Sequence, residues 1–464
     1  MTLELEDIQG FIVRSYNNLE KACYVMIQFT NISEAKLFFK QLTIEITVAS
    51  SKPTELAVQL AFTNLGIKKL TEDLDIKEPF SSEFSEGLCD ENRSRILGDI
   101  DTNDPSDWNW GGPTKKLVDA VIMLFASTDN VLETKYQALL QRMAATGVTK
   151  VIRLDTGNTG TKEHFGFEDG LTNPLIKGMK SERKNIASTS DQHDVIMPGE
   201  FILGYENEYN KLPDSPRLLM KDSSEIDIGK NGTYMVFREL QQDVHGFWNY
   251  MNELKQTNVY FSNMSLELMA SKMVGRWRNG KPLTKTLDPD AAIDPKANFL
   301  YAQDDKDGFK CPIGAHIRRS NPRDSIDDDP ALSLEMTKKH MILRRARSFG
   351  EYLFVNAESI DLPKVNNDSR RGLYFICLNA QINRQFEFIQ NTWCNNKKFD
   401  GLENDVDPLV GFPFLESKYQ LRTFTVQDKP YRKKTSSLPQ FVKVKGGAYF
   451  FMPGIRALIA LCQE

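Results

Sequence analysis

Residues 232–256 read GTYMVFRELQQDVHGFWNYMNELKQ, a strand-like run followed at once by a helix-like one. The same order stands near the start of the chain, where KACYVMIQFT at 21–30 is rich in β-branched and aromatic residues. It is followed by SEAKLFFKQL at 33–42, which has helical spacing behind Ser33 as candidate N-cap. This repeated order predicts two successive α+β units, each with antiparallel strands backed by helices, rather than a doubly wound parallel sheet.

The remaining periodic segments extend this pattern along the chain. Further elements are expected at 56–63, 118–127, 131–145, 372–380, 381–393 and 446–462. Residues 181–195 are polar and lack periodicity, which is typical of a linker or a long loop. The sequence therefore predicts an N-terminal domain over 1–185 and a C-terminal domain over 196–464, in keeping with its 464 residues.

Composition limits the classes of partner. Hydrophobic residues make up 40% and charged residues 26% of the chain, the balance of a soluble globular protein. The 58 Lys and Arg residues against 63 Asp and Glu residues give a net charge of −5, which predicts neither nucleic acid nor a membrane surface as a partner. No apolar run approaches the roughly 20 residues that span a bilayer. The start, MTLELEDIQGF, shows no export signal.

The six cysteines are far apart in the sequence and form no CxxC pair or zinc spacing. They are Cys23, Cys89, Cys311, Cys377, Cys394 and Cys462. Without a signal peptide, buried reduced thiols are expected rather than disulfides. With no export signal visible, this pattern favours a cytoplasmic location.

Three common functional motifs are absent or incomplete in the sequence. Asp-Thr-Gly at 155–157 looks like half of an aspartic protease site, but no second copy follows an apolar strand. DDKDG at 304–308 lacks the glutamate that closes a calcium-binding EF-hand loop. No G-x-x-x-x-G-K-[ST] phosphate loop occurs in the chain. We interpret the first two segments as turns.

Two stretches carry candidate site residues. HFGFEDGLTNP at 164–174 places an acidic pair between two glycines. CPIGAHIRRSNPR at 311–323 predicts a short helix that starts near Pro312 and ends before Pro322, with His316 early in it. Taken alone, such a histidine is more often a satisfied core residue than a ligand, so the assignment depends on its neighbours.

Arg344 is the third candidate. In HMILRRARSFG at 340–350 it directly follows a buried-looking Met-Ile-Leu run. Its guanidinium is therefore expected to face the interior or a cleft, where it must meet an anion because a buried unpaired charge is costly.

These residues together resemble a known family, the dye-decolourising peroxidases, whose G-x-x-D-G motif matches GFEDG at 166–170. Eight collinear segments carry the resemblance over almost the whole chain: DIQGFIV (7–13), PGEFILGYENE (198–208), GTYMVFREL (232–240), MVGRWRNGKPL (273–283), CPIGAHIRRSNPR (311–323), ILRRARSFG (342–350), GLYFICLNAQINRQFEFIQ (372–390) and GGAYFFMPG (446–454). The resemblance implies an α+β fold of two tandem ferredoxin-like domains, related to the dimeric α+β barrels, with haem bound chiefly against the second domain.

The same resemblance implies one haem b per chain, with His316 as the iron ligand. Glu387 then corresponds to the family's proximal carboxylate, which would accept a hydrogen bond from the ligand's other ring nitrogen. His164 and Arg318 correspond to residues near the haem propionates, whose charges need donors.

On the distal side, the resemblance makes Asp169 the acid–base residue that moves the peroxide proton. Arg344 would stabilise charge on the departing oxygen. Leu373 and Phe375 alternate on one strand and could face the distal pocket together, although core packing explains them almost equally well. The implied function is a peroxidase that reduces hydrogen peroxide through a ferryl intermediate and oxidises phenolic or dye-like reductants in one-electron steps.

Two other functions fit the same features. The first is a haem-binding or iron-release protein with little peroxidase turnover, but a carrier has no need of both Asp169 and Arg344 above the iron. The second is a haem enzyme of another class, such as the chlorite-dismutase relatives, against which the G-x-x-D-G motif argues. Electron relay to the surface would need Tyr or Trp residues, and Trp248, Trp277, Trp393 and Tyr374 are candidates only through their redox chemistry. The sequence leaves the oligomeric state open.

Overall fold

The computed structural model describes residues 2–157, 160–179, 195–220, 222–353, 370–412, 422–435 and 437–463. Of the expected linker at 181–195, all but the last residue lies outside the described residues.

The first α+β unit is a four-stranded antiparallel sheet with two helices. Its elements in chain order are β1 (Lys21–Phe29), α2 (Ile32–Thr43), β2 (Leu56–Phe62), β4 (Ala120–Ala126), α6 (Asp129–Ala145) and β5 (Val148–Asp155). The strands lie side by side in the order β5-β1-β4-β2. Counted within the unit, this is the order 4-1-3-2 of a ferredoxin-like sheet.

The second unit repeats this arrangement. Its elements are β10 (Thr233–Gln242), α7 (Val244–Thr257), β11 (Leu343–Arg344), β12 (Arg347–Phe349), β13 (Gly372–Asn379), η5 (Asn383–Glu387), η6 (Ile389–Cys394) and β16 (Val442–Met452). The strand order is β16-β10-β13, with β11 and β12 both pairing with the outer side of β13. If β11 and β12 are counted as one interrupted strand, this is again 4-1-3-2. The predicted α+β fold with two tandem ferredoxin-like units is confirmed.

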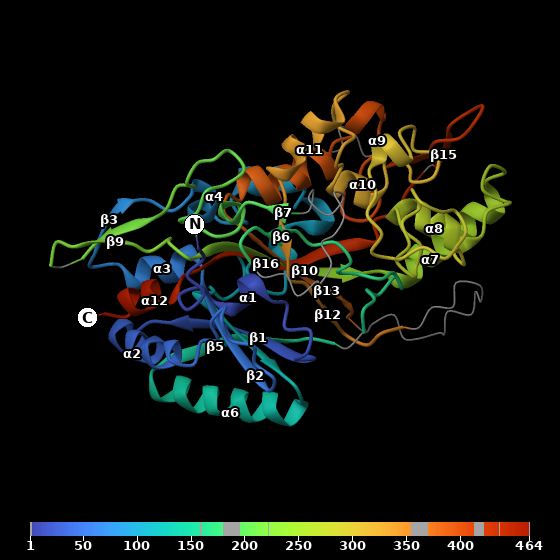
Figure 1. The fold of residues 1–464 in the computed structure, drawn as a ribbon. Helices are drawn as coiled ribbons and strands as arrows, with labels where there is room; N and C mark the ends of the chain where they lie inside the picture. Colours follow the sequence, from blue (N-terminus) through green and yellow to red (C-terminus); the bar gives the residue numbers. More distant parts are fainter. Residues whose placement is uncertain are drawn as a thin grey trace.

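The two units share one sheet. β16 pairs with β2 through Phe451 and Phe62, so the strands form a single nine-stranded sheet. Figure 1 shows the blue strands β1 and β2 of the first unit in the lower part of the molecule with α6 below them, and α7 and α8 at the right.

Both faces of this sheet are buried. On β1, Val25 and Ile27 pack in one core cluster with residues of α2, while the alternate residues Tyr24 and Met26 belong to a second cluster. This alternation follows from the two-residue period of a strand. Each cluster contains residues of both units, so the units do not have separate cores.

Smaller elements complete the fold. The helices are α1 (Gly10–Val13), α3 (Asn64–Leu70), α4 (Ser82–Glu86), α5 (Glu91–Leu97), α8 (Leu266–Val274), α9 (Tyr301–Asp304), α10 (His316–Ser320), α11 (Pro330–Lys338) and α12 (Ile455–Leu461), with short 3₁₀ turns at η1 (Asp101–Asn103), η2 (Pro105–Asp107), η4 (Pro198–Glu200) and η7 (Phe399–Gly401). The strands are β3 (Asp75–Glu78), β8 (Arg217–Leu219) and β9 (Glu225–Asp227) in one small sheet, β6 (Leu175–Ile176) with β7 (Val195–Ile196), and β14 (Phe424–Val426) with β15 (Lys433–Thr435). Within the described ranges, no helix has the length and hydropathy needed to cross a bilayer.

Two expected helix starts are wrong. The helix at 33–42 is capped by Asn31, whose side chain accepts a hydrogen bond from Glu34 N, and not by Ser33. The helix expected near Pro312 begins only at His316, because residues 312–315 form a turn closed by Ala315 N and Pro312 O at 3.0 Å. Its predicted end is confirmed, with Asn321 as the C-cap. All six cysteines are described and unpaired, and all but Cys89 are buried.

Candidate active site

A cavity of about 290 Å³ lies against the second unit of the sheet. Five of the eight predicted site residues line it: Asp169, His316, Arg344, Leu373 and Phe375. Its apolar wall includes Val274, Phe386, Ile389, Leu409, Val442 and Val444. The fold thus brings together the acid, the histidine and the arginine that the sequence marked as candidates, although Asp169 and Arg344 are 175 residues apart in the chain.

Asp169 is presented by a small hairpin over residues 161–169. Asp169 N donates to Thr161 O at 2.9 Å, and Lys162 pairs with Glu168 as an antiparallel bridge. The tip turns at Gly166, which has φ +97°, a conformation that L side chains rarely adopt. The first glycine of the motif therefore serves the turn, and the strand-like arm after it carries the carboxylate to the cavity, where the second glycine, Gly170 with φ +69°, follows Asp169.

Arg344 faces the same part of the cavity. Its Nη1 lies 3.4 Å from Asp169 Oδ1, and its Nη2 donates to Thr172 O at 2.8 Å. The backbone N of Arg344 donates to Asn173 Oδ1 at 3.3 Å. The segment after the hairpin thus holds the arginine by both main chain and side chain, so acid and arginine are positioned as one group. The expectation that Arg344 meets an anion in a cleft is confirmed.

Leu373 and Phe375 form the neighbouring wall. Both lie on β13, where the alternate residues Tyr374 and Ile376 pack in the core cluster on the other face of the sheet. The strand period therefore turns Leu373 and Phe375 to the cavity together.

His316 is the first residue of α10 and is held by a buried carboxylate. Its Nδ1 lies 2.9 Å from Asp407 Oδ2, which leaves Nε2 as the ring nitrogen not engaged by this contact. Burial lowers the pKa of His316, but the charge of Asp407 and its hydrogen bond to the ring together outweigh burial and raise the pKa above its usual value. Leu409 N and Val410 N each donate to Asp407 Oδ1 at 2.9 Å. Burial opposes ionisation of Asp407, yet these donors and His316 lower its pKa.

The prediction that Glu387 is the carboxylate beside His316 is wrong. Glu387 accepts hydrogen bonds from Tyr449 Oη and Arg93 Nη1, both at 2.9 Å, and does not line the cavity. Asp407 takes the place expected for it. Its loop has no periodicity, and nothing local in the sequence distinguishes Asp407 from the other acidic residues of that region.

Arg318 does not face the cavity as predicted. It is buried, and its two terminal nitrogens donate to three backbone carbonyls, those of Asp305, Lys306 and Cys311. It also lies over the ring of Tyr301, with 4.6 Å between its Cζ and the ring centroid. Arg318 therefore fixes the loop that leads into α10.

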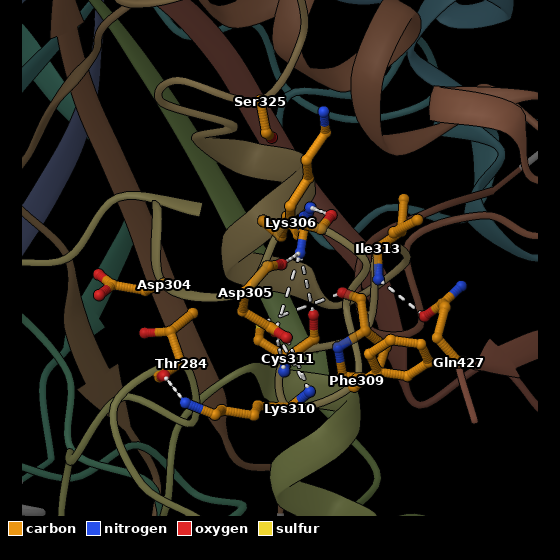
Figure 2. A network of polar contacts seen from close by, with 12 residues as sticks. Thr284, Asp304, Asp305, Lys306, Phe309, Lys310, Cys311, Ile313, Ser325 and Gln427 are labelled. Atoms are coloured by element: carbon orange, nitrogen blue, oxygen red, sulfur yellow. Dashed lines mark hydrogen bonds and ion pairs between the residues drawn. The ribbon is translucent and has the colours of Figure 1, made fainter. Parts of the chain in front are cut away.

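Asp305 fixes the same loop from within. Its carboxylate accepts from Cys311 N at 2.6 Å and from Lys310 N at 3.0 Å. Figure 2 shows this network, with Lys310 Nζ reaching Thr284 O and Ile313 N donating to Gln427 Oε1. The acidic turn at 304–308 is thus a structural support for His316.

His164 also lies outside the cavity wall. It is fully buried, and its Nε2 is 2.8 Å from Phe349 O on β12. Burial lowers its pKa to about 4, so the imidazole is neutral near pH 7. In the structure it ties the tip of the hairpin to the sheet.

Two arginines that we had not singled out do line the cavity. Arg276 donates to Gly280 O and Pro295 O, and Arg323 donates to Asn298 Oδ1 and Phe299 O. Both are buried, and burial together with Arg323 lowers the pKa of Arg276 to about 10. Neither forms an ion pair with a carboxylate in the part of the chain that the structure describes. Arg323 ends the quoted segment 311–323, but its sequence carried no sign that it, rather than Arg318, turns inward.

Comparison with known proteins agrees with this geometry. Residues 197–418 match the family description "Dyp-type peroxidase, C-terminal". The dye-decolorizing peroxidase msp1 of Mycetinis scorodonius is 27% identical over 98% of this chain and 87% of its own length. An ancestral D-type dye-decolorizing peroxidase has a similar structure, with a TM-score of 0.79 and 26% identity over 99% of both chains.

The chain is thus similar to dye-decolourising peroxidases over nearly its whole length, in sequence and in fold. The multifunctional dye peroxidase DyP2 of Amycolatopsis is 29% identical over 77% of this chain and 74% of its own length. A dye-decolorizing peroxidase solved in complex with 2,6-dimethoxyphenol has a TM-score of 0.77 and 25% identity, and the match covers 99% of this chain and 100% of that one. Among the described residues, no group of three or more His, Cys, Asp or Glu side chains could hold a metal ion.

Proposed function

We propose that this chain is a peroxidase that binds one haem b in the cavity, with His316 Nε2 as the iron ligand. The observation that carries the proposal is the shared cavity of Asp169, Arg344 and His316, in which Asp407 holds Nδ1 of the histidine. A carboxylate on the second ring nitrogen fixes the tautomer and the orientation of a metal-bound imidazole.

The cavity suits such a group in two further respects. Its wall is largely apolar, as a macrocycle requires. Arg276 and Arg323 offer buried guanidinium groups without a carboxylate partner in the described ranges, and an unpaired buried charge is costly. The two propionates of a haem would supply the missing negative charge, a role that we move from His164 and Arg318 to these arginines.

When bound, the haem would supply the two electrons that reduce hydrogen peroxide. Asp169 would accept the proton of the incoming peroxide and return it to the departing oxygen. Arg344 would stabilise the negative charge on that oxygen, because its guanidinium is already held beside Asp169 by Thr172 and Asn173. Leu373 and Phe375 would exclude water from the same space.

We further propose small aromatic compounds such as phenols as the reductants, on the strength of the relative solved with 2,6-dimethoxyphenol. The four residues considered as electron relays are all at most 5% exposed: Trp248, Trp277, Trp393 and Tyr374. None of them could contact a bulky dye directly. The two-domain division at 185–196 and the cytoplasmic location stay predictions.

A spectroscopic experiment tests the proposal. The purified, haem-loaded protein is mixed with one equivalent of hydrogen peroxide, and the Soret band is followed by stopped flow. We expect a rapid shift of the band and consumption of the peroxide. The variant H316Q should lose the absorbance features of an imidazole-bound haem. A Soret band that stays unchanged while haem remains bound would favour the alternative, a haem-binding or iron-release protein of the same fold.

A further inference from the structure

Glu163 is a second carboxyl group in the cavity wall. It lies inside the hairpin that carries Asp169, where Phe167 N donates to its Oε1 at 2.8 Å and Phe165 N donates to its Oε2 at 2.9 Å. Gln242 Nε2, at the end of β10, donates to Oε2 at 2.7 Å. The three described donors to this carboxylate are neutral, so no cation in these contacts offsets its charge.

The amide group of Gln242 can form a hydrogen bond with Glu163 in either protonation state. Its Nε2 donates to the carboxylate, while its Oε1 is buried and has no hydrogen-bond partner among the described residues. A half-turn of the amide would exchange the two atoms. The carbonyl oxygen could then accept the O–H of a protonated Glu163, which would satisfy the acceptor that is otherwise unpaired.

Burial of Glu163 favours a proton on its carboxyl group. The charged and titratable groups around it come from its own hairpin (His164, Glu168 and Asp169), from Arg278 and Tyr352, and from the Arg238–Asp99 ion pair, which lines the same cavity as Gln242. Burial, with a smaller contribution from Asp169, raises the pKa of Glu163 to about 7. Glu163 is therefore neutral below this pH and negative above it.

We propose that Glu163 and Gln242 form a proton-holding pair in the wall of the distal cavity, and that this pair sets the charge beside Asp169. Glu163 is a positioning residue in this role, because it acts on the reaction through Asp169. As the pH rises through 7, Glu163 loses its proton and places a second negative charge near Asp169, which makes Asp169 a stronger proton acceptor. The inference rests on the proposed function only for its effect on peroxide reduction, and not for the titration itself.

The titration is tested first, by infrared spectroscopy of the purified full-length protein between pH 5 and 9. We expect a protonated-carboxyl C=O band that disappears on passing pH 7 and is missing in E163Q. E239Q is the matched control, since Glu239 is a buried carboxylate on β10 and bonds Trp110 Nε1 instead. The band must remain in E239Q. A band that persists in E163Q would overturn the proposal.

A second variant guards against misfolding of E163Q. Q242L removes both the donor to the ionised form and the acceptor for the protonated form. The two losses act in opposite directions, but the donated hydrogen bond is the one present in the structure and it lowers the pKa of Glu163, so the titration should move to higher pH. If the titration in Q242L were unchanged, Gln242 would have no influence on the protonation of Glu163, and the proposed pair would be refuted.

The effect on the reaction is tested by the rate constant for peroxide reduction of the haem-loaded enzyme. Wild type and E239Q should show a step near pH 7, with a roughly threefold to tenfold higher rate at pH 8 than at pH 6, as one added charge would cause. E163Q should lack this step. If the enzyme shows no reaction with peroxide, the proposed function fails while the infrared result still stands; if it reacts without the step, the inference fails alone.

Discussion

The contact between His316 Nδ1 and Asp407 Oδ2 decides which nitrogen of the imidazole is available to a ligand. Asp407 is itself held by two backbone N–H groups and is fully buried, so neither partner can rotate freely. The carboxylate of Asp407 therefore holds the imidazole ring of His316 in one orientation, whether or not a ligand is bound.

Replacement of Asp407 by Asn should weaken haem binding or activity roughly tenfold to a hundredfold, as is typical for the hydrogen-bond partner of a metal-bound histidine. The measurement is a haem-transfer titration against an acceptor protein. E387Q serves as the control, because Glu387 bonds Tyr449 and Arg93 instead. Equal losses in both variants would contradict the assignment of Asp407.

His164 should make folding stability depend on pH. Its pKa is about 4 in the folded protein and about 6.5 when unfolded, so the unfolded chain binds a proton that the folded chain refuses. The free energy of unfolding should thus fall as the pH drops from 6.5 towards 4, by about 3 kcal/mol in total from this residue. Urea denaturation at pH 7 and pH 5 checks this. In H164Q the loss between these pH values should be smaller than in wild type.

At the scale of single residues, site residues within a compact motif could be predicted from the sequence, whereas those in irregular loops could not. Asp169, Arg344 and His316 stand next to glycines, apolar runs or prolines that restrict their placement. Asp407 and Arg323 also stand next to a proline, Pro408 and Pro322, yet they reach the site only through tertiary folding, so a neighbouring proline is no sufficient signal. Nothing in the sequence indicated that Glu163 lines the cavity, although this residue directly precedes the segment HFGFEDGLTNP at 164–174.

Among the elements, the loop before α10 shows how a short helix is held without much intrinsic stability. α10 has only five residues, too few to be stable in isolation. Arg318 reaches back from this helix to the carbonyls of Asp305, Lys306 and Cys311, and so ties the helix to the loop that precedes it.

Replacement of Arg318 by Met should lower the free energy of unfolding by about 2–4 kcal/mol, because buried carbonyl groups lose their donors. Chemical denaturation measures the change. R217M is the control, since Arg217 is an exposed residue in a surface ion pair with Glu225 and should change stability by no more than about 0.5 kcal/mol. A similarly small effect of R318M would show that water replaces the guanidinium.

The strands and the longer helices were predictable because their periodicity is set by burial on one or both faces. The start of α10 was not, because proline at 312 suits a turn as well as a first helical turn. In the same way, Asn31 and Ser33 are both good caps, and the sequence alone does not rank them.

For the whole molecule, the pairing of Phe451 with Phe62 joins the two units, and both core clusters contain residues of each. The repeated strand order was foreseeable from the repeated sequence pattern. The join was not, because it depends on which edges meet in three dimensions. The two units should consequently unfold together.

Replacement of Phe451 by Ala tests this cooperativity. Phe451 is fully buried against Phe80 and Tyr234, so truncation should cost about 3–5 kcal/mol. Hydrogen exchange should then accelerate in β4 and in β13 alike. Faster exchange in only one of these strands would show that the units unfold separately.

The two edges of the nine-stranded sheet differ in the features that hinder pairing with a further strand. At one end, β5 carries Lys150 and Arg153, and Arg153 is paired with Glu133. At the other, β11 and β12 are only two and three residues long, and Arg345 between them turns back to donate to Phe11 O and Ile12 O. Charged or interrupted edges resist the addition of a strand from another chain. The segment that brings Arg344 to the cavity therefore also protects the protein against edge-to-edge aggregation.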